Sequence, residues 1–331
     1  MKSCGDLSTA LLRAAISRLT FSVAQRYTSD MPRGTEDVRR PAKNFGAAEL
    51  FGFAVPALMP SELQRLSMTP NRSQPCPFKS KRVACHKKGG VCSLGQYVRN
   101  ASGDVCIVGT PVTTCPSRFL EGGLVFSWVG ETLLGTRHPT VVAEVSFLMS
   151  ESCKEPDAQH EVGRIDNVLV HFEKTQLVWC ALEMQAVYFS GAKFEHDLAI
   201  MRQWSGPGIP MPPRQRHPDF RSSGPKRLMP QLQTKVPTLR RWGKKMAVVV
   251  DRAFWQAQGD MRRASSLSNA DIIWFVVDFE GPVGERYVLK PHDVVFTTLE
   301  NAVEGLTGGT AVSLEQFEHA IRQKLARLEA S

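Results

Sequence analysis

Two carboxylates fall where the sequence predicts the two strands of one β-hairpin. The hairpin is the segment GRIDNVLVHFEKTQLVWCALEMQAVYFSG, in which two largely apolar runs flank a short polar break. If the turn is centred on Lys174 and Thr175, Asp166 lies directly opposite Glu183 on the neighbouring strand. A shift of one residue in this register would separate the two acids, because successive side chains point to opposite faces. In the assumed register, the hairpin predicts two carboxylates close together on one surface.

A close pair of carboxylates favours a Mg²⁺ site. Mg²⁺ prefers oxygen ligands and often takes only one or two carboxylates, with substrate phosphate and water completing its shell. Gln185 lies two residues after Glu183 on the same face of the strand, where it could align an attacking water. The alternative is a pair of ordinary strand-end carboxylates, but Glu183 lies in an otherwise apolar strand, where an acid needs a partner or a metal. An Asp followed on the next strand by Glu-x-Gln has the spacing of PD-(D/E)XK nucleases.

Five of the eight cysteines are concentrated between residues 76 and 115. Four thiolates in a tetrahedron suit zinc or iron, and a loop-rich segment would gain folding free energy from such a site. We expect no secretory signal peptide, which makes a disulfide framework the weaker interpretation. The spacings are irregular, so buried free cysteines remain the alternative, and His86 could replace one sulfur. The five candidates are Cys76, Cys85, Cys92, Cys106 and Cys115.

The positive charge of the chain is confined to one segment. Between Arg214 and Lys245 there are ten basic residues and one acid, so this segment alone accounts for the formal net charge of +9 of the 331-residue chain. Such a segment favours contact with the phosphates of a nucleic acid, and the alternative is a solvated loop that keeps the protein soluble. The best candidates for DNA contact are Lys226, Arg227, Arg240, Arg241, Lys244 and Lys245.

The composition and length predict a soluble globular protein with one large domain and a smaller module. Hydrophobic residues make up 42% of the chain and charged residues 22%, and no segment approaches the roughly 20 apolar residues that cross a bilayer. A membrane-spanning function is therefore excluded. We expect a disordered extension over 1–43, a small cysteine-bearing module over 44–120, and a larger domain over 121–331 that includes the basic, proline-rich segment 201–245.

Hydrophobic patterns predict the main elements of the larger domain. Residues 201–237 carry eight prolines, too many for one uninterrupted regular element. Residues 44–65 are expected to be partly helical, with Ser61 as a helix N-cap, and residues 66–120 to be rich in loops. The predicted strands are 123–129, 141–147, 165–172, 177–187, 246–250 and 271–279, with a helix over 252–258 between the last two.

The C-terminal segment is the clearest helix. Ser313 and Gln316 form a capping-box pattern at its start, followed by one apolar stripe. We expect this stripe to pack on the core of the chain, and the alternative is packing on a second subunit. The stripe consists of Leu314, Phe317, Ile321, Leu325 and Leu328.

Taken together, these motifs resemble the NotI-type restriction endonuclease family. The resemblance starts at NFGAAELFGF, passes through CPF, GVC and CPSR, continues into LEMQAVYFSG and reaches DIIWFVVDFE. It covers roughly residues 44–280 and is looser towards the C-terminus. The order and spacing of several motifs together make the resemblance more specific than any single motif.

The resemblance implies a type II, Mg²⁺-dependent, sequence-specific endonuclease of double-stranded DNA. Its fold would be a PD-(D/E)XK mixed sheet flanked by helices, preceded by a small module with a four-cysteine site for iron or zinc. By the resemblance, Cys106 is the surplus thiol. The implied metal ligands are Cys76, Cys85, Cys92 and Cys115.

The resemblance also implies the catalytic residues. Asp166, Glu183 and the backbone carbonyl of Met184 would hold Mg²⁺, and Gln185 would position the attacking water. The hairpin before Glu183 is shorter than in the best-known member of the family, which leaves Glu161 and Asp157 as fallbacks for the Asp166 role. The DNA-facing segments match less well, so the target sequence is not transferred.

The partners follow from this function. We expect double-stranded DNA, a two-fold homodimer, a cognate DNA methyltransferase, and a place in the cytoplasm of a prokaryotic cell. Two rival functions stay open. One is a non-catalytic DNA-binding regulator with a four-cysteine metal site, and the other is a less specific repair or recombination nuclease.

Overall fold

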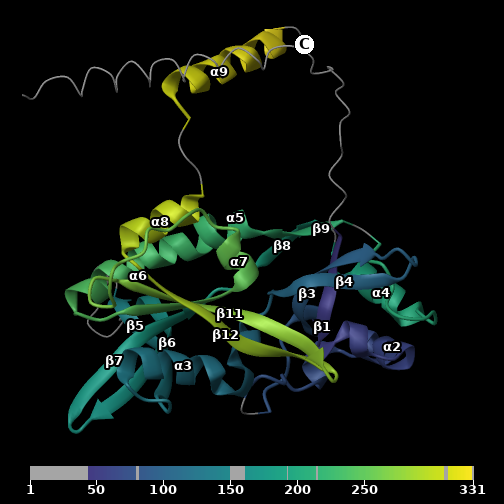
Figure 1. Ribbon diagram of the computed structural model, residues 1–331, viewed down its shortest axis with the longest axis horizontal. Helices are drawn as coiled ribbons and strands as arrows, with labels where there is room; N and C mark the ends of the chain where they lie inside the picture. The colour runs from purple at the N-terminus through teal and green to yellow at the C-terminus, as the bar shows by residue number, and fades with distance from the viewer. Residues whose placement is uncertain are drawn as a thin grey trace, which may run out of the picture. The chain divides into compact units, whose positions relative to one another are not determined.

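The computed structural model describes residues 44–79, 82–149, 161–191, 193–213, 215–308 and 312–329. These residues form two mixed β-sheets with helices packed around them (Figure 1). The predicted class, an α/β protein with mixed sheet flanked by helices, is therefore confirmed. The assignment to the PD-(D/E)XK fold stays a prediction.

The first sheet combines four strands from residues 44–113 with two strands from residues 188–219. Its strand order is β4-β3-β1-β9-β8, with β2 paired to β1. Only the short β1–β9 pairing is parallel, and β1 is buried along nearly its whole length. The strands are β1 (Asn44–Leu50), β2 (Phe53–Ala54), β3 (Val91–Arg99), β4 (Val105–Thr113), β8 (Tyr188–Gly191) and β9 (Arg216–Asp219).

The second sheet has the order β12-β11-β10-β7-β6-β5. Its central strand β10 runs parallel to both neighbours, β7 and β11, while the outer pairs are antiparallel. The strands are β5 (Thr140–Met149), β6 (Glu161–Glu173), β7 (Gln176–Met184), β10 (Met246–Asp251), β11 (Ile272–Val283) and β12 (Arg286–Thr297).

Helices cover both faces of the second sheet (Figure 1). Helix α3 (Leu124–Leu134) packs on one face, and α6 (Met229–Arg241), α7 (Arg252–Gln256) and α8 (Leu299–Thr307) pack on the other. This arrangement explains why β10 and β11 are near-continuous apolar runs, since a strand buried on both faces does not need polar alternation. The other α-helices are α2 (Pro60–Met68), α4 (Glu195–Gln203), α5 (Phe220–Ser223) and α9 (Leu314–Glu329).

Five short helical turns complete the described elements. They connect strands or extend neighbouring helices, as such turns commonly do. They are η1 (Val55–Ala57), η2 (Asn71–Ser73), η3 (Lys88–Gly90), η4 (Pro116–Gly123) and η5 (Gly224–Leu228).

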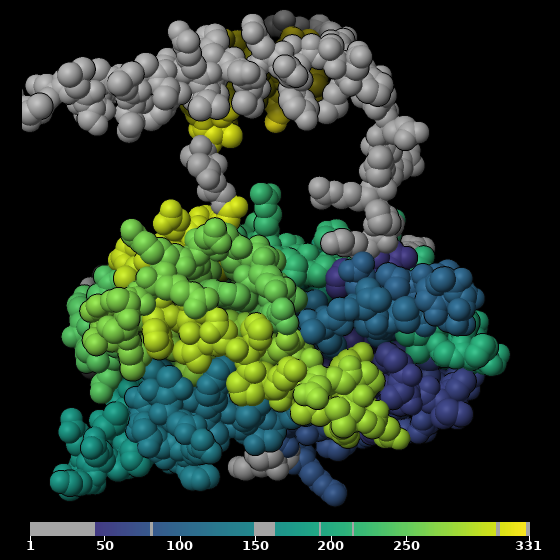
Figure 2. All heavy atoms as spheres, in the orientation of Figure 1, coloured from purple at the N-terminus to yellow at the C-terminus, as the bar shows by residue number. Residues whose placement is uncertain are grey.

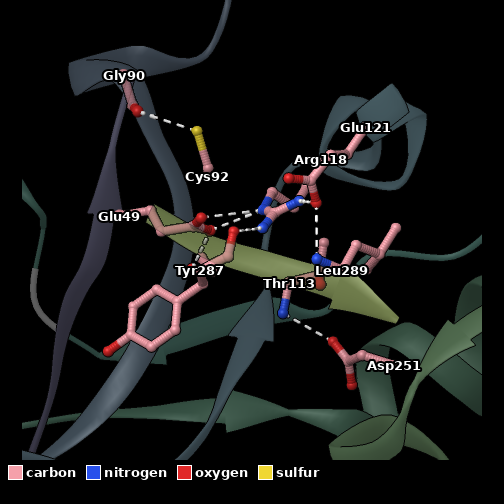
Figure 3. Close-up of polar contacts among 10 residues, drawn as sticks. Glu49, Gly90, Cys92, Thr113, Arg118, Glu121, Asp251, Tyr287 and Leu289 are labelled. Atoms are coloured by element: carbon pink, nitrogen blue, oxygen red, sulfur yellow. Dashed lines mark hydrogen bonds and ion pairs between the residues drawn. The ribbon is translucent and has the colours of Figure 1, made fainter. Parts of the chain in front are cut away.

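A buried arginine joins the two sheets (Figure 3). Arg118 is 0% exposed, and its Nε donates to Glu49 of β1 at 2.9–3.0 Å. Its Nη1 donates to Glu121 at 2.7 Å and its Nη2 to the carbonyl oxygen of Tyr287 in β12 at 2.8 Å. Glu121 also accepts from the backbone N–H of Leu289 at 2.7 Å. The guanidinium thus fixes β1 of the first sheet against β12 of the second.

A second buried contact holds the end of β4 beside the second sheet. The Asp251 carboxylate accepts from the backbone N–H of Thr113 at 2.7 Å and caps α7 through Phe254 N–H at 2.7 Å (Figure 3). Burial raises the pKa of Asp251 to about 6. The carbonyl of Thr113 accepts from Val187 N–H at 2.8 Å. The segment that leads to Cys115 is therefore bonded to the segment that follows β7.

One predicted strand and one predicted helix cap are wrong. The segment 123–129, predicted as a strand, lies in helix α3, because a short apolar run does not distinguish a strand from a buried helix. Gly123 and Gly135, both with φ near +69°, bracket that helix. Residues 44–65 are partly helical, as expected, since β1 takes residues 44–50 and α2 begins at Pro60, but Met59 rather than Ser61 is the N-cap of that helix.

The proline-rich and cysteine-bearing segments are more regular than predicted. Residues 66–120 contain the nine-residue strands β3 and β4, whose alternating patterns are interrupted by glycines and bulges. Residues 201–237 are divided among several elements, as predicted, but α6 continues through Pro237. Helix α6 therefore runs through a segment in which the sequence indicated only breaks.

The C-terminal helix is confirmed as α9, with the predicted capping box. Ser313 N–H donates to Gln316 Oε1 at 3.0 Å, and Gln316 N–H donates to Ser313 Oγ at 3.2 Å. The five apolar side chains of its stripe are 44–72% exposed. The expected packing of this stripe on the core is not seen among the described residues.

The predicted division into domains stays a prediction. Residues 1–43 lie outside the described part of the chain, and the first sheet takes β8 and β9 from beyond residue 120. Across the described ranges, no helix combines the length and apolar character needed to cross a membrane.

Candidate active site

The β6–β7 hairpin has the register that the sequence predicted. Paired positions run from Asn167 opposite Leu182 to Glu173 opposite Gln176, with Lys174 at a φ of 57° in the two-residue turn. The same register places Asp166 opposite Glu183. The tip of the hairpin projects from the rest of the molecule at one corner of the view (Figure 2).

All four residues of the predicted catalytic group line one cavity. The cavity has a volume of about 410 Å³ and opens where β7 ends. Asp166, Glu183, Met184 and Gln185 contribute to its wall from the two strands of the hairpin and the residues just after it. The remaining wall is formed by Lys87, Thr114, Pro116, Ala186, Tyr188, Arg227 and Gln231.

Glu183 is a buried carboxylate held by a lysine. It is 3% exposed, and its Oε2 accepts from the Nζ of Lys235 in α6 at 2.7 Å. Burial raises the pKa of Glu183 to about 7, with the nearby Asp166 adding to this rise and Lys235 opposing it. Lys235 also donates to Gln231 Oε1 at 3.0 Å, so its ammonium group has two hydrogen-bond partners inside the protein. Sequence reasoning missed Lys235, because a contact across 52 residues leaves no spacing pattern.

Gln185 is anchored at the end of β7. Its backbone N–H donates to Val249 of β10 at 2.9 Å, and its side-chain Nε2 donates to the carbonyl oxygen of Ala186 at 2.6 Å. These bonds fix the amide in the cavity wall. The side chain at this position is a neutral amide, whereas the PD-(D/E)XK pattern predicted from the sequence usually has a lysine here.

Of the two fallback acids, only Glu161 belongs to the described part of the chain. Glu161 begins β6 five residues before Asp166, which corresponds to about 17 Å along an extended strand. Asp157 lies outside the described residues. Asp166 is therefore the acid that the hairpin brings to Glu183.

The donor set at this cavity fits Mg²⁺ in kind. Asp166 and Glu183 offer hard carboxylate oxygens, and Met184 lies beside them in the wall. Glu183 needs a counter-charge at this depth, which Lys235 supplies to one of its two oxygens. Asp166 and Glu183 are therefore the residues that could hold a divalent cation at this cavity, and the Mg²⁺ site stays a prediction.

Three of the predicted cysteine ligands line a second cavity. Cys76, Cys85 and Cys115 contribute to a space of about 240 Å³ together with His86 and Lys87. A small antiparallel bridge brings the first two together, since Cys76 N–H donates to Val83 and Cys85 N–H donates to Gln74. The sequence clustering of these cysteines thus corresponds to closeness in space.

The fourth predicted ligand, Cys92, is buried next to this group. Its carbonyl oxygen accepts from Cys115 N–H at 3.1 Å, and burial raises the pKa of its thiol well above the usual range. Burial also raises the pKa of Cys85. Within the described ranges, no three His, Cys, Asp or Glu side chains are already gathered as a metal site. The metal site stays a prediction. Cys106 lies apart, opposite Val98 in the β3–β4 pair.

Fewer basic side chains of segment 214–245 are free at the surface than the sequence implied. Arg216 and Lys235 are buried in ion pairs with Asp197 at 2.8 Å and Glu183 at 2.7 Å. Arg240 donates to Asp271 at 2.9 Å and to Glu300 at 3.0 Å. At least three of the ten cations therefore stabilise the fold.

The six predicted DNA-contacting residues fall into two groups. Lys226 and Arg227 are exposed in η5, where Arg227 lines the catalytic cavity with its guanidinium 3.5 Å from the centre of the Tyr188 ring. The other four follow near the far end of α6, about 20 Å away along the helix. There Lys244 stacks over Trp179, Lys245 donates to the carbonyls of Ser268 and Ala270, Arg241 donates to Thr238, and Arg240 makes the ion pairs above.

Comparison with known proteins gives one family. The family model described as "Restriction endonuclease NotI" matches residues 62–289, which is more than half of the chain. The matched range contains the cysteine group, the β6–β7 hairpin and the basic segment. No curated protein matches the chain.

Proposed function

The chain belongs to the NotI restriction endonuclease family, and from this premise we propose that it is a type II restriction endonuclease. It hydrolyses phosphodiester bonds at a specific sequence of double-stranded DNA and depends on Mg²⁺. The observation that carries this proposal is the cavity into which one hairpin brings Asp166, Glu183 and Gln185. Their order on the strands is that of a PD-(D/E)XK site with glutamine in place of lysine.

The polar side chains of the cavity have separate roles in the proposed hydrolysis. Asp166 and Glu183 would hold Mg²⁺ with the carbonyl oxygen of Met184, and the bound ion supplies polarisation of the phosphate and activation of a water. Lys235 holds one oxygen of Glu183, which fixes the orientation of that carboxylate. Gln185 orients the attacking water, because an amide does not act as a base at neutral pH.

Lys226 and Arg227 are the best-placed cations for DNA contact. Replacing both with alanine should weaken binding of duplex DNA and lower the slope of log affinity against log salt by about 2, since each phosphate contact contributes about 0.9. The measurement is duplex affinity without Mg²⁺ between about 50 and 200 mM salt. Arg137→Ala, which removes an exposed cation paired with Glu131, is the control and should leave the slope unchanged. A wild-type affinity that does not fall with salt would remove these residues from the DNA-binding surface.

The four cysteines Cys76, Cys85, Cys92 and Cys115 are proposed to hold one iron or zinc ion. The purified protein should contain about one such ion per chain, since structural sites of this kind take four ligands. Cys85→Ser and Cys115→Ser should lose it, whereas Cys106→Ser should keep it because Cys106 lies in β4 apart from the group. Metal analysis of the three variants decides the assignment. Loss of the ion in Cys106→Ser, or its retention in Cys85→Ser, would contradict it.

The assembly follows from the symmetry of the target. Cutting both strands of a palindrome is most simply done by a two-fold homodimer in which each subunit holds one half-site. We propose such a dimer, acting in the cytoplasm of a prokaryotic cell beside a cognate DNA methyltransferase. The four-cysteine site and the basic segment would serve DNA binding in this assembly.

Digestion of mixed plasmid DNA with Mg²⁺ tests the function. A type II endonuclease gives discrete fragments. Intact DNA would favour the non-catalytic regulator, and smears or cuts at structural features would favour a repair or recombination nuclease.

A further inference from the structure

Lys87 lines both of the cavities described above, the one with Asp166 and Glu183 and the one with the three cysteines. It contributes to the wall of the catalytic cavity with Asp166 and Glu183, and also to the wall of the thiol cavity with Cys85. Its Nζ donates to the carbonyl oxygen of Thr114 at 2.6 Å and to its Oγ1 at 3.3 Å. The cysteine-bearing segment therefore places an amine at the edge of the catalytic site.

The position of Lys87 is fixed by the same backbone that carries the thiols. Lys87 follows Cys85 by two residues, and its partner Thr114 immediately precedes Cys115. The backbone N–H of Thr114 donates to the carbonyl oxygen of Cys92 at 3.1 Å. Helix η3 begins directly after Lys87. The amine is thus held between two loops that converge on one point.

The charges around the catalytic cavity make Lys87 distinct from the other cations there. Lys235 is paired with the Glu183 carboxylate, and Arg227, which is exposed and stacked on the Tyr188 ring, is proposed above to contact the DNA backbone. Gln185, at the position where a lysine would be expected, carries no charge. The hydrogen bonds from Lys87 to Thr114 use two neutral oxygens, so neither bond pairs the amine with a carboxylate.

We propose that Lys87 contacts the scissile phosphate and supplies the positive charge that Gln185 does not. An ammonium group has three N–H donors, and Thr114 accepts two of them, so one remains for a phosphate oxygen. This inference rests on the proposed endonuclease function. It makes the cysteine-bearing segment part of the catalytic site as well as of the fold. The rival role for Lys87 is that of a counter-ion to the thiols alone.

The first arm of the test measures cleavage. Lys87→Met should slow single-turnover cleavage of the target duplex by about a hundredfold, the usual loss for one donor to a developing charge. Lys88→Met is the matched control, because Lys88 is adjacent and exposed, and it should stay within threefold of wild type. Lys87→Gln keeps an N–H donor for Thr114 without the charge, so it decides the question if Lys87→Met does not fold. Either Lys87 variant cleaving at the Lys88→Met rate would overturn the proposal.

The second arm measures the contact without cleavage. Wild-type protein in the absence of Mg²⁺ should bind a duplex with a neutral methylphosphonate at the scissile position about tenfold more weakly than the natural duplex, because a charged contact is lost. In Lys87→Gln this difference should shrink to within threefold, and in Lys88→Met it should persist. An unchanged difference in Lys87→Gln would overturn the proposal and leave Lys87 a structural role.

Three outcomes distinguish the ways in which the proposal could fail. If Lys87→Gln loses iron or zinc together with its cleavage rate, the lysine serves the thiols and the proposal falls. If wild-type protein cuts no DNA at all, the proposed function fails before Lys87 is tested. A wild type that cuts, beside a Lys87→Gln that cuts equally well, refutes only the role of Lys87.

Discussion

Glu183→Gln is expected to abolish Mg²⁺-dependent cleavage, with a fall in the single-turnover rate of about a thousandfold or more. The physical reason is the loss of a carboxylate ligand from a site whose metal contributes several kcal/mol to the transition state, and each 1.4 kcal/mol is about tenfold in rate. Glutamine keeps the size of the side chain and an oxygen acceptor for Lys235, so packing around it is preserved. Duplex affinity without metal should stay within a few-fold of wild type.

The same hairpin offers the control for this experiment. Glu173→Gln removes an exposed acid next to the turn of the β6–β7 hairpin, far from the cavity, and should cleave at the wild-type rate. Asp166→Asn should behave like Glu183→Gln, because both carboxylates line the same space. If Glu183→Gln cut DNA as fast as Glu173→Gln, the catalytic site would lie elsewhere.

Arg118→Met is expected to produce the largest loss of stability, about 3–5 kcal/mol in the free energy of unfolding. Breaking a buried ion pair by removing one partner costs this much, because the remaining carboxylate is left uncompensated. Here Glu49 is 0% exposed and, of its side-chain partners among the described residues, would keep the Ser93 hydroxyl at 2.6 Å. The Tyr287 carbonyl and Glu121 would lose their bonds at the same time. Urea unfolding followed by tryptophan fluorescence measures the effect.

An exposed ion pair provides the comparison. Arg137→Met removes the partner of Glu131 at the surface, and its unfolding midpoint should match that of wild type. A loss in Arg118→Met no greater than in Arg137→Met would mean that the sheets are not joined by this network.

The catalytic hairpin could be predicted because its determinants are local. Apolar runs on both sides of a two-residue polar break fix the turn at Lys174 and Thr175, and the turn fixes every cross-strand pair up to Asn167 and Leu182. The meeting of Asp166 and Glu183 follows from that register. The closeness of Cys76 and Cys85 is local in the same way, since one small bridge joins their segments.

The two lysines at the cavity, Lys235 and Lys87, could not be predicted, because they lie on segments that are distant in sequence from the hairpin. Lys235 reaches Glu183 from α6, a helix whose prolines indicated a break rather than a helix. Lys87 reaches the same cavity from the cysteine-bearing segment through its bonds to Thr114. Neither contact has a fixed sequence spacing, and both depend on how the two sheets pack.

The sum of charges over a segment also says nothing about burial. The formal charge of the basic segment equals the net charge of the chain, yet Arg216 and Lys235 are buried inside the protein in ion pairs. Helix α3 shows the same limit for apolar runs, since Val125 and Val129 would suit a strand or a helix until the sheet they cover is known. Tertiary packing decides both cases.

The central claim is sequence-specific cleavage of double-stranded DNA, and sequencing the ends of the fragments tests it most directly. Mixed plasmid DNA is digested by wild-type protein with Mg²⁺, with Glu183→Gln protein as the blank, and all new ends are read. The account predicts one palindromic sequence at every end, cut at the same position on both strands, and no new ends with Glu183→Gln. Ends at unrelated sequences, or the same ends with Glu183→Gln, would contradict it.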